Sequence, residues 1–384
     1  MGMRRVLQCV GGMNCGGVET WLMHVLRRID RRRIAMDFLV QTDRPCVYDE
    51  EIRGLGSRIL HCTPVHRPWR FMPELARILR HQGPFHVVHS HVHHFSGLIL
   101  KCAHRCGVPI RIAHSHSDTR FVENGARLLR RGYLRLAESW IHRHATTRLA
   151  CSRKAGAALF GPKWEEDPAA RLLYCGIDLA PFRRAWDRAA ARAQWGIPED
   201  ALVLGHVGRL EPPKNHAFLL EIAAEVARRR PSMRLLLVGD GQLRPQIEAK
   251  ARQLGLAEKV IFAGWCGDVA DVLGGAMDVF VFPSLYEGLP LSCVEAQAAG
   301  LPTFISDAVT GEVGAIDDLV TWLSSQASAA VWAEAILQRP PRSAVDQRQA
   351  LSLLSAGPFA IENCLPLLEG LYYREPATPI RRAA

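Results

Sequence analysis

Residues 279–300 read VFVFPSLYEGLPLSCVEAQAAG, and this stretch holds a strand, a turn and a helix in that order. The run from Val279 to Phe282 is β-branched and aromatic, which predicts a short buried strand. A turn containing Pro283 and Gly288 follows, and the residues up to Gly300 are typical of a helix. Since strands that alternate with helices form a parallel sheet covered on both faces, this stretch predicts an α/β fold.

The same unit recurs along the chain in two groups. Strands of the first group are predicted at 5–10, 36–41, 58–61, 87–90 and 108–113. The pattern begins again near residue 200, with strands predicted at 202–207, 235–238, 260–262, 279–282 and 303–305. We therefore expect two doubly wound domains, at 1–180 and 181–356, facing a cleft at the carboxyl ends of their strands.

Composition indicates a globular cytoplasmic protein. The 384 residues are 48% hydrophobic, the mean hydropathy is near zero, and no apolar run approaches the roughly 20 residues that span a bilayer. The N-terminus shows no signal-peptide pattern. The eleven scattered cysteines form no C-x-x-C pair, so we expect free thiols. Cys102, His104 and Cys106 lie on a predicted helix, which favours core positions over a metal site.

The net charge is +10 and comes mainly from arginine. No nucleic-acid-binding motif accompanies it, so we expect no nucleic-acid partner. The segment 127–148 concentrates arginines among apolar residues at helical spacing. It is typical of a basic helix at a membrane surface, and equally of a solvated helix that packs an apolar stripe on the core.

Glu287 and Glu295 are separated by seven residues at the predicted junction of strand and helix. Such a junction exposes backbone N–H groups and the positive end of the helix dipole, which favour a bound phosphate. A carboxylate two turns into the helix can accept hydrogen bonds from ribose hydroxyls. The alternative is a capped helix with a solvated Glu295.

A second motif follows the predicted strand 202–207 and contains Gly208, Arg209 and Lys214. Two cations on a strand-end loop suit a diphosphate leaving group, because they offset the charge that grows as its bond breaks. A plain basic loop is the alternative. The sequence contains no D-x-D element, so arginine, lysine and helix dipoles would take the place of a metal.

Two further features lie in the first half. Gly16 and Gly17 end a glycine loop after the first strand that resembles a phosphate-binding turn, although it lacks the G-x-G-x-x-G spacing. The histidines concentrate at 86–94 and at 114–116, and their spacing fits strand ends better than a metal cage. For contact with a donor sugar we rank His116 slightly above His114.

Taken together, these residues resemble the family 4 retaining glycosyltransferases, and most closely the branch that builds capsular polysaccharides and exopolysaccharides. The resemblance covers nearly the whole chain and rests on these segments: 16–20, 88–91, 111–116, 150–152, 176–178, 205–209, 214–216, 287–302 and 306–307. It implies the GT-B fold of two Rossmann-like domains facing a central cleft. It also implies that a helix at 357–375 crosses back to the first domain, ahead of a disordered tail at 376–384.

The resemblance also implies roles for residues. Arg209 and Lys214 would hold the diphosphate, with help from the Gly16–Gly17 loop. Glu287 would contact the donor sugar and Glu295 the ribose. The remaining donor-binding positions implied are Gly264 and Trp265 for the base and the backbone of Gly288, Leu289, Pro290 and Leu291 for the phosphates.

The function implied is retaining transfer of a sugar from a nucleotide-diphosphate-sugar, commonly a UDP-sugar, to a saccharide or lipid-linked acceptor, without metal or cofactor. Two alternatives stay open: a nucleotide-sugar epimerase of the same fold, and a catalytically silent nucleotide-binding subunit of a polysaccharide assembly complex. One departure concerns Tyr174-Cys175, which stand where relatives usually carry an asparagine. The interdomain linker is therefore expected to differ locally.

Overall fold

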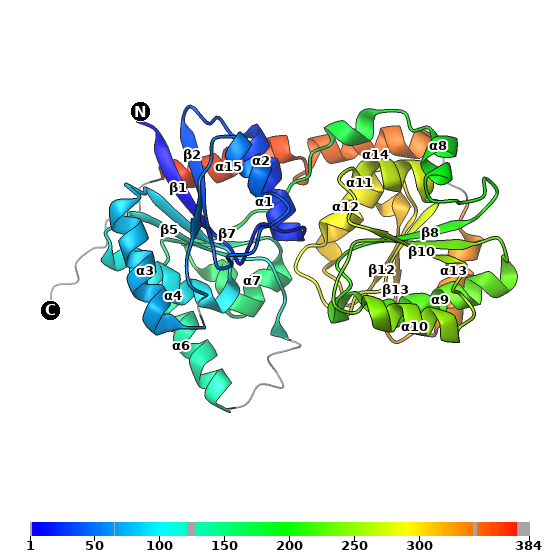
Figure 1. Ribbon diagram of the computed structural model, residues 1–384, viewed down its shortest axis with the longest axis horizontal. Coiled ribbons are helices and arrows are strands. Elements are labelled where there is room, and N and C mark those ends of the chain that lie inside the picture. Colours follow the sequence, from blue (N-terminus) through cyan, green and yellow to red (C-terminus); the bar gives the residue numbers. More distant parts are fainter. Residues whose placement is uncertain (1, 65, 121–127, 341–343, 375–384) are drawn as a thin grey trace. The chain divides into compact units, whose positions relative to one another are not determined.

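The computed structural model describes residues 2–64, 66–120, 128–340 and 344–374. The chain divides into two compact units, one formed by residues 1–175 with 364–384 and the other by 176–363 (Figure 1). Each unit contains one parallel sheet with helices on its faces. The predicted fold class, two doubly wound α/β domains, is therefore confirmed.

The first unit is built on a seven-stranded sheet with the order β3-β2-β1-β4-β5-β6-β7. Its strands are β1 (Arg4–Cys9), β2 (Ile34–Val40), β3 (Ile59–His61), β4 (Val87–Ser90), β5 (Ile110–Ser115), β6 (Thr147–Ala150) and β7 (Ala170–Leu172). Its helices are α1 (Gly17–Arg28), α2 (Asp49–Gly54), α3 (Pro68–His81), α4 (Ser96–Arg105), α6 (Leu128–His144), α7 (Arg153–Phe160) and, from Cys364 onward, α15 (Ile361–Tyr373). The order reverses at β1, as in other doubly wound sheets.

The second unit has a six-stranded sheet with the order β10-β9-β8-β11-β12-β13. Its strands are β8 (Val203–Val207), β9 (Arg234–Val238), β10 (Val260–Gly264), β11 (Val279–Phe282), β12 (Thr303–Ser306) and β13 (Val320–Leu323). Its helices are α8 (Arg188–Ala193), α9 (His216–Arg229), α10 (Arg244–Gln253), α11 (Val269–Asp271), α12 (Leu291–Ala298), α13 (Ala329–Gln338) and α14 (Ala344–Ala356). All its strand pairs are parallel.

Three strands, β6, β7 and β13, were not expected from the sequence. They are short, and β6 and β7 contain the polar residues Arg148 and Arg171, which weaken the apolar signal. Arg148 is nevertheless buried, because its guanidinium forms an ion pair with Asp167. Strand β13 lies at an edge of its sheet and leaves Trp322 exposed.

The basic helix expected at 127–148 is shorter than predicted. Helix α6 ends at His144, and Thr147 begins strand β6. The β-branched pair Thr146–Thr147 favours an extended chain, and the Thr146 N–H donates to the carbonyl of Arg111 in β5. Arg148 therefore belongs to the sheet rather than to the helix, and Arg127 lies outside the described residues.

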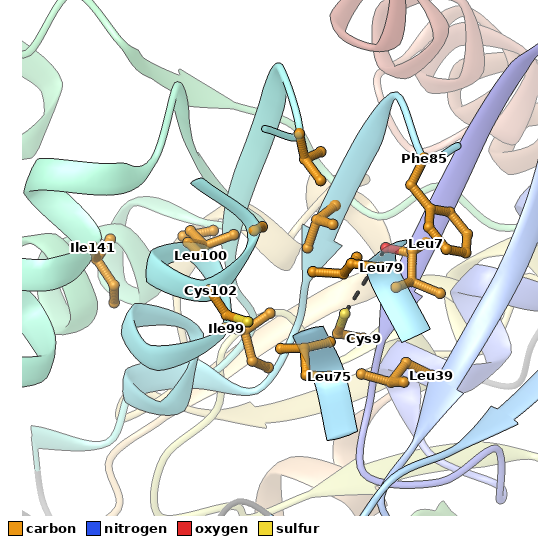
Figure 2. Packing of buried hydrophobic residues seen from close by; sticks show 14 of the residues in the cluster. Leu7, Cys9, Leu39, Leu75, Leu79, Phe85, Ile99, Leu100, Cys102 and Ile141 are labelled. Atoms are coloured by element: carbon orange, nitrogen blue, oxygen red, sulfur yellow. Dashed lines mark hydrogen bonds between the residues drawn. The ribbon is translucent and has the colours of Figure 1, made fainter. Parts of the chain in front are cut away.

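The core of the first unit fills the space between the sheet and helices α3 and α4. Leu7 and Cys9 from β1 meet Leu75 and Leu79 from α3, and Leu100 lies behind them on α4 (Figure 2). These side chains alternate along β1 in the manner of a sheet with one face on each helical layer. This apolar core covers the length of the strands, so polar groups are found at the carboxyl ends of the strands.

Helix α7 contains Gly156, although glycine has a low helix propensity. A Cβ on Gly156 would lie 2.2 Å from Cε2 of the buried Trp164. Gly132 is also inside a helix, α6, but a Cβ there would meet nothing within 4 Å. Helix propensity alone favours alanine at both positions.

We therefore expect opposite effects from the same substitution. Gly156→Ala should lower the unfolding free energy of the first unit by about 1–3 kcal/mol, because the indole must move. Gly132→Ala should be neutral or raise it by about 0.5–1 kcal/mol. Urea unfolding followed by tryptophan fluorescence measures both, and equal stability of the two variants would contradict this packing.

Candidate active site

Two of the predicted motifs meet at the carboxyl edge of the second sheet. Strands β8 and β11 are neighbours, so the loop after Val207 lies beside the loop after Phe282. The backbone N–H of Leu285 donates to the carbonyl of Pro213 at 2.8 Å, and the Asn215 amide donates to the carbonyl of Pro283 at 3.2 Å. The basic loop and the E-x7-E loop thus form one structure.

The centre of this structure is an ion pair between Lys214 and Glu287. Nζ of Lys214 lies 2.7 Å from Oε1 of Glu287, and the side chains are only 17% and 14% exposed. The ammonium also lies 4.7 Å from the ring centroid of Phe282. Because an ammonium has three donors, Lys214 can keep this bond and still donate to a bound anion.

The glycines around this ion pair are required by space. A Cβ on Gly208 would lie 3.1 Å from Cε of Lys214 and 3.2 Å from Nε2 of His206. Gly239, with φ of +123°, approaches so closely that its Cβ would lie 2.2 Å from the carbonyl oxygen of Gly208. Glycine at 208 leaves room for the Lys214 side chain, and glycine at 239 lets the two turns approach each other.

Arg209 is placed differently from Lys214. Its side chain is 60% exposed and pairs with Glu211 at 3.1 Å. An exposed ion pair of this kind contributes little to stability and exchanges readily. Arg209 is therefore available to turn toward an anionic ligand, whereas Lys214 is held in position.

Glu295 lies in the second turn of α12, which begins at Leu291. Burial raises the pKa of its carboxyl to about 7. Helix α12 follows Gly288, Leu289 and Pro290, which are buried. The resemblance implied that the backbone from Gly288 to Leu291 contacts the phosphates. Pro290 has no N–H and cannot donate, so only its neighbours can.

Gly264 ends strand β10, and Trp265 follows it, at the same edge of the sheet. Gly264 has φ of +67°, and its carbonyl accepts from the N–H of Gly239 at 2.7 Å. Trp265 is 52% exposed. An exposed indole beside strand-end backbone groups is suited to contact with a nucleobase.

The other predicted residues lie in the first unit. Gly17 opens helix α1, and Gly16 precedes it as the N-cap residue. A Cβ on Gly16 would lie 2.3 Å from Oε2 of Glu19, a flexible carboxylate that can move aside. The loop that contains Gly16 follows β1, and His114 lies near the end of β5. Both are therefore at the carboxyl edge of the first sheet.

The four histidines of this edge form a connected network. Nε2 of His89 lies 3.2 Å from Nδ1 of His114, and Nδ1 of His91 lies 2.8 Å from Nε2 of His116. Burial lowers the pKa of His116 to about 3 and that of His114 well below its ordinary value, so both rings are neutral near pH 7. His114 is fully buried, whereas His116 keeps some exposed surface.

Sequence reasoning missed the residues that support this network. Oε1 of Gln8 lies 2.9 Å from Nε2 of His91. Nε2 of Gln8 donates to the hydroxyl of Tyr372 at 2.9 Å. The same hydroxyl lies 3.0 Å from Nδ1 of His89. Tyr372 is on the terminal helix, 283 positions from His89, so no local pattern could have found it.

Comparison with known proteins shows which family the chain resembles. The model of "Glycosyl transferase 4-like domain" matches residues 16–175, and that of "Glycosyl transferases group 1" matches residues 187–339. The chain is 40% identical over 357 residues, 90% of its own length and 92% of the relative's, to EpsF of Bacillus subtilis (strain 168), itself a glycosyltransferase by assignment only. It is 29% identical over 232 residues, 58% of each chain, to the Escherichia coli UDP-Gal:alpha-D-GlcNAc-diphosphoundecaprenol alpha-1,3-galactosyltransferase.

Solved structures show the same fold. HepE of Anabaena, determined in complex with UDP and glucose, gives a TM-score of 0.77 at 18% identity over 96% of this chain and 98% of its own. Sucrose-phosphate synthase of Thermosynechococcus elongatus gives 0.78 at 19% identity, with the same coverage. The fold and these matches define a glycosyltransferase of the GT-B class. The chain belongs to glycosyltransferase family 4.

The raised pKa of Glu295 predicts a pH-dependent stability. Its carboxyl has a pKa of about 7 in the folded chain against an ordinary value of 4.5, so between these values the folded chain holds a proton that the unfolded chain has released. The unfolding free energy should therefore fall as the pH rises through this window, by about 3 kcal/mol.

Glu295→Gln should remove this dependence, whereas Glu258→Gln, at an exposed position, should retain it. Unfolding free energies measured at intervals from pH 5 to pH 8 make the comparison. Parallel curves for the wild type and Glu295→Gln would show that Glu295 does not titrate differently in the folded chain.

Proposed function

We propose that the protein is a metal-independent, retaining glycosyltransferase that uses a UDP-sugar and extends a saccharide or lipid-linked acceptor in polysaccharide biosynthesis. The observation that carries the proposal is the Lys214–Glu287 pair beside Arg209, between the end of β8 and the start of α12. Support for the donor comes from HepE, solved with UDP-glucose, and support for the acceptor class from the Escherichia coli relative, named for a diphosphoundecaprenol-linked sugar.

Each residue of this edge has a role in donor binding. Arg209 and Lys214 hold the diphosphate, and the N-terminus of α12 adds its dipole. Glu287 accepts hydrogen bonds from sugar hydroxyls while it fixes the lysine. The carboxylate of Glu295 accepts from the ribose hydroxyls, and Trp265 contacts the base.

The chemistry proposed is a front-face displacement. The bond between the anomeric carbon and the phosphate oxygen breaks, and the acceptor oxygen bonds to the same face of that carbon. The acceptor proton passes to a leaving phosphate oxygen, so no protein nucleophile is consumed. Arg209 and Lys214 stabilise the negative charge that grows on the nucleoside diphosphate, which is where preorganised cations accelerate a reaction most.

Donor turnover tests this proposal directly. With EDTA present, the protein should release nucleotide from one member of a panel of UDP-, GDP- and ADP-sugars. Arg209→Ala, Lys214→Ala and Glu287→Ala should each lower this rate by about 10²–10³-fold, the cost of removing one preorganised charge. Arg252→Ala, at an exposed position on α10, is the matched control and should leave the rate unchanged.

The outcomes separate the alternatives. Near-normal turnover in Lys214→Ala would refute the role assigned to the ion pair. Conversion of the donor to an epimer would identify an epimerase. Tight nucleotide binding, measured by thermal shift, without turnover with any acceptor would identify a silent subunit.

We place the protein in the cytoplasm, on the inner face of the membrane through helix α6. None of the helices in the described part of the chain has the length and apolarity needed to cross a bilayer. On α6, Ala137 and Ile141 pack into the core, while Tyr133 and Leu136 remain 36% and 46% exposed. Exposed apolar residues among arginines are typical of a helix lying at an anionic surface.

Replacing Arg130, Arg131 and Arg135 together with alanine should weaken binding to vesicles that contain anionic lipid. Each cation near such a surface contributes about 1 kcal/mol, so the triple variant should bind more than about a hundredfold less tightly at low salt. The control replaces the exposed Arg32, Arg44 and Arg252. Equal vesicle co-sedimentation of both triple variants and the wild type would contradict the membrane role.

A further inference from the structure

Histidine and cysteine side chains gather where three neighbouring strands of the first unit end. His114 lies on β5 and His116 follows it, Cys151 follows β6, and Cys175 lies three residues after β7. The strands are adjacent in the sheet, and the N–H of Cys151 donates to the carbonyl of Ser115 at 3.0 Å. One ligand atom from each of His114, His116 and Cys175 lies within 4.8 Å of the other two.

Each ring is held through one nitrogen by a second histidine, and the other nitrogen of His116 is hydrogen-bonded with Cys175. Nδ1 of His114 is engaged with His89, and its Nε2 is buried with no hydrogen-bond partner in the part of the chain that the structure describes. Nε2 of His116 is engaged with His91, and its Nδ1 faces Sγ of Cys175 at 3.7 Å. Histidines that bind metals are held in this way, with the second nitrogen bonded to a group behind the ring.

A second histidine group does not have this property. His89, His91 and His114 also bring ligand atoms within 4.8 Å of one another. His89, however, uses its nitrogens toward Tyr372 and His114, and His91 uses its own toward Gln8 and His116. These two residues therefore support the rings of His114 and His116 rather than offering ligand atoms themselves.

Cys151 lies next to this group, although its Sγ is not among the three ligand atoms that lie within 4.8 Å of one another. Its side chain is hydrogen-bonded to that of Cys175, and both thiols are buried. A divalent ion in a buried site without carboxylates needs thiolate ligands to balance its charge. Two neutral imidazoles and two thiolates give a neutral site, and this ligand set with tetrahedral geometry is typical of Zn²⁺.

We propose that His114, His116 and Cys175 bind one divalent transition-metal ion of the Zn²⁺ class, and that the Cys151 thiol, which is hydrogen-bonded to Cys175, moves in as the fourth ligand. On binding, each thiol releases its proton to solvent and its sulfur forms a bond to the metal; no electron is transferred. The ion takes no part in the sugar-transfer chemistry proposed above. It fixes the ring of His116, so metal loading withdraws that histidine from any contact with a donor sugar.

Cobalt(II) binding tests this proposal without any measurement of sugar transfer. The probe is Co²⁺ itself, titrated into the full-length, untagged, metal-free protein under reducing conditions. We expect one equivalent to produce a sulfur-to-cobalt charge-transfer band and the intense visible bands of tetrahedral cobalt, and Zn²⁺ to abolish both. Cys175→Ser should lower the charge-transfer intensity, because one of the two thiolates is lost. His91→Ala should weaken binding about 10–100-fold through the ring that it holds.

Cys106→Ser is the matched control, because Cys106 is a half-buried cysteine at the end of α4 outside this cluster. It should leave the cobalt spectrum and stoichiometry unchanged. Absence of a charge-transfer band in the wild type, or an unchanged band in Cys175→Ser, would overturn the proposal. His116→Gln, with circular dichroism to verify folding, gives the same test if Cys175→Ser does not fold.

Discussion

In a parallel sheet every strand ends at the same edge, and this constraint decides where the chemistry of this protein can lie. Backbone pairing occupies the length of the strands, and helices cover both faces. The polar groups that follow the strands therefore collect at one edge, although their positions in the sequence are far apart. The Lys214–Glu287 pair joins loops from β8 and β11 in this way, 73 residues apart in sequence.

The carboxyl edges of the two sheets both collect polar side chains, but the charges of these side chains differ. In the second unit the ion pair is only slightly exposed, and burial shifts Glu295 toward its neutral form. In the first unit the rings of His114 and His116 are kept neutral by burial and by repulsion from neighbouring histidines. A neutral ring can accept a hydrogen bond or bind a metal, whereas the charged pair is suited to a diphosphate.

The sequence predicted the elements with continuous apolar runs, such as β9 and β11, because burial on both faces of a sheet leaves a clear pattern. It missed β6 because Arg148, which reads as a surface residue, is neutralised by Asp167 after folding. The same arginine extended the predicted helix too far, since charge spacing alone does not distinguish a helix from a following strand. Element type thus followed from local pattern, while its boundaries depended on tertiary partners.

The candidate site residues also differ in whether a local pattern could identify them. Residues of one motif, such as Glu287 and Glu295, could be chosen from spacing, because strand-end turns and helix starts have a local chemistry. The groups that support the histidine network could not, since Gln8 comes from β1 and Tyr372 from the terminal helix. Cys175 is the clearest case: it appeared in the sequence as a departure from the family pattern, and only the sheet order places it beside His116 and Cys151. A substitution that changes a linker in sequence therefore changes the chemistry of a strand edge in the folded protein.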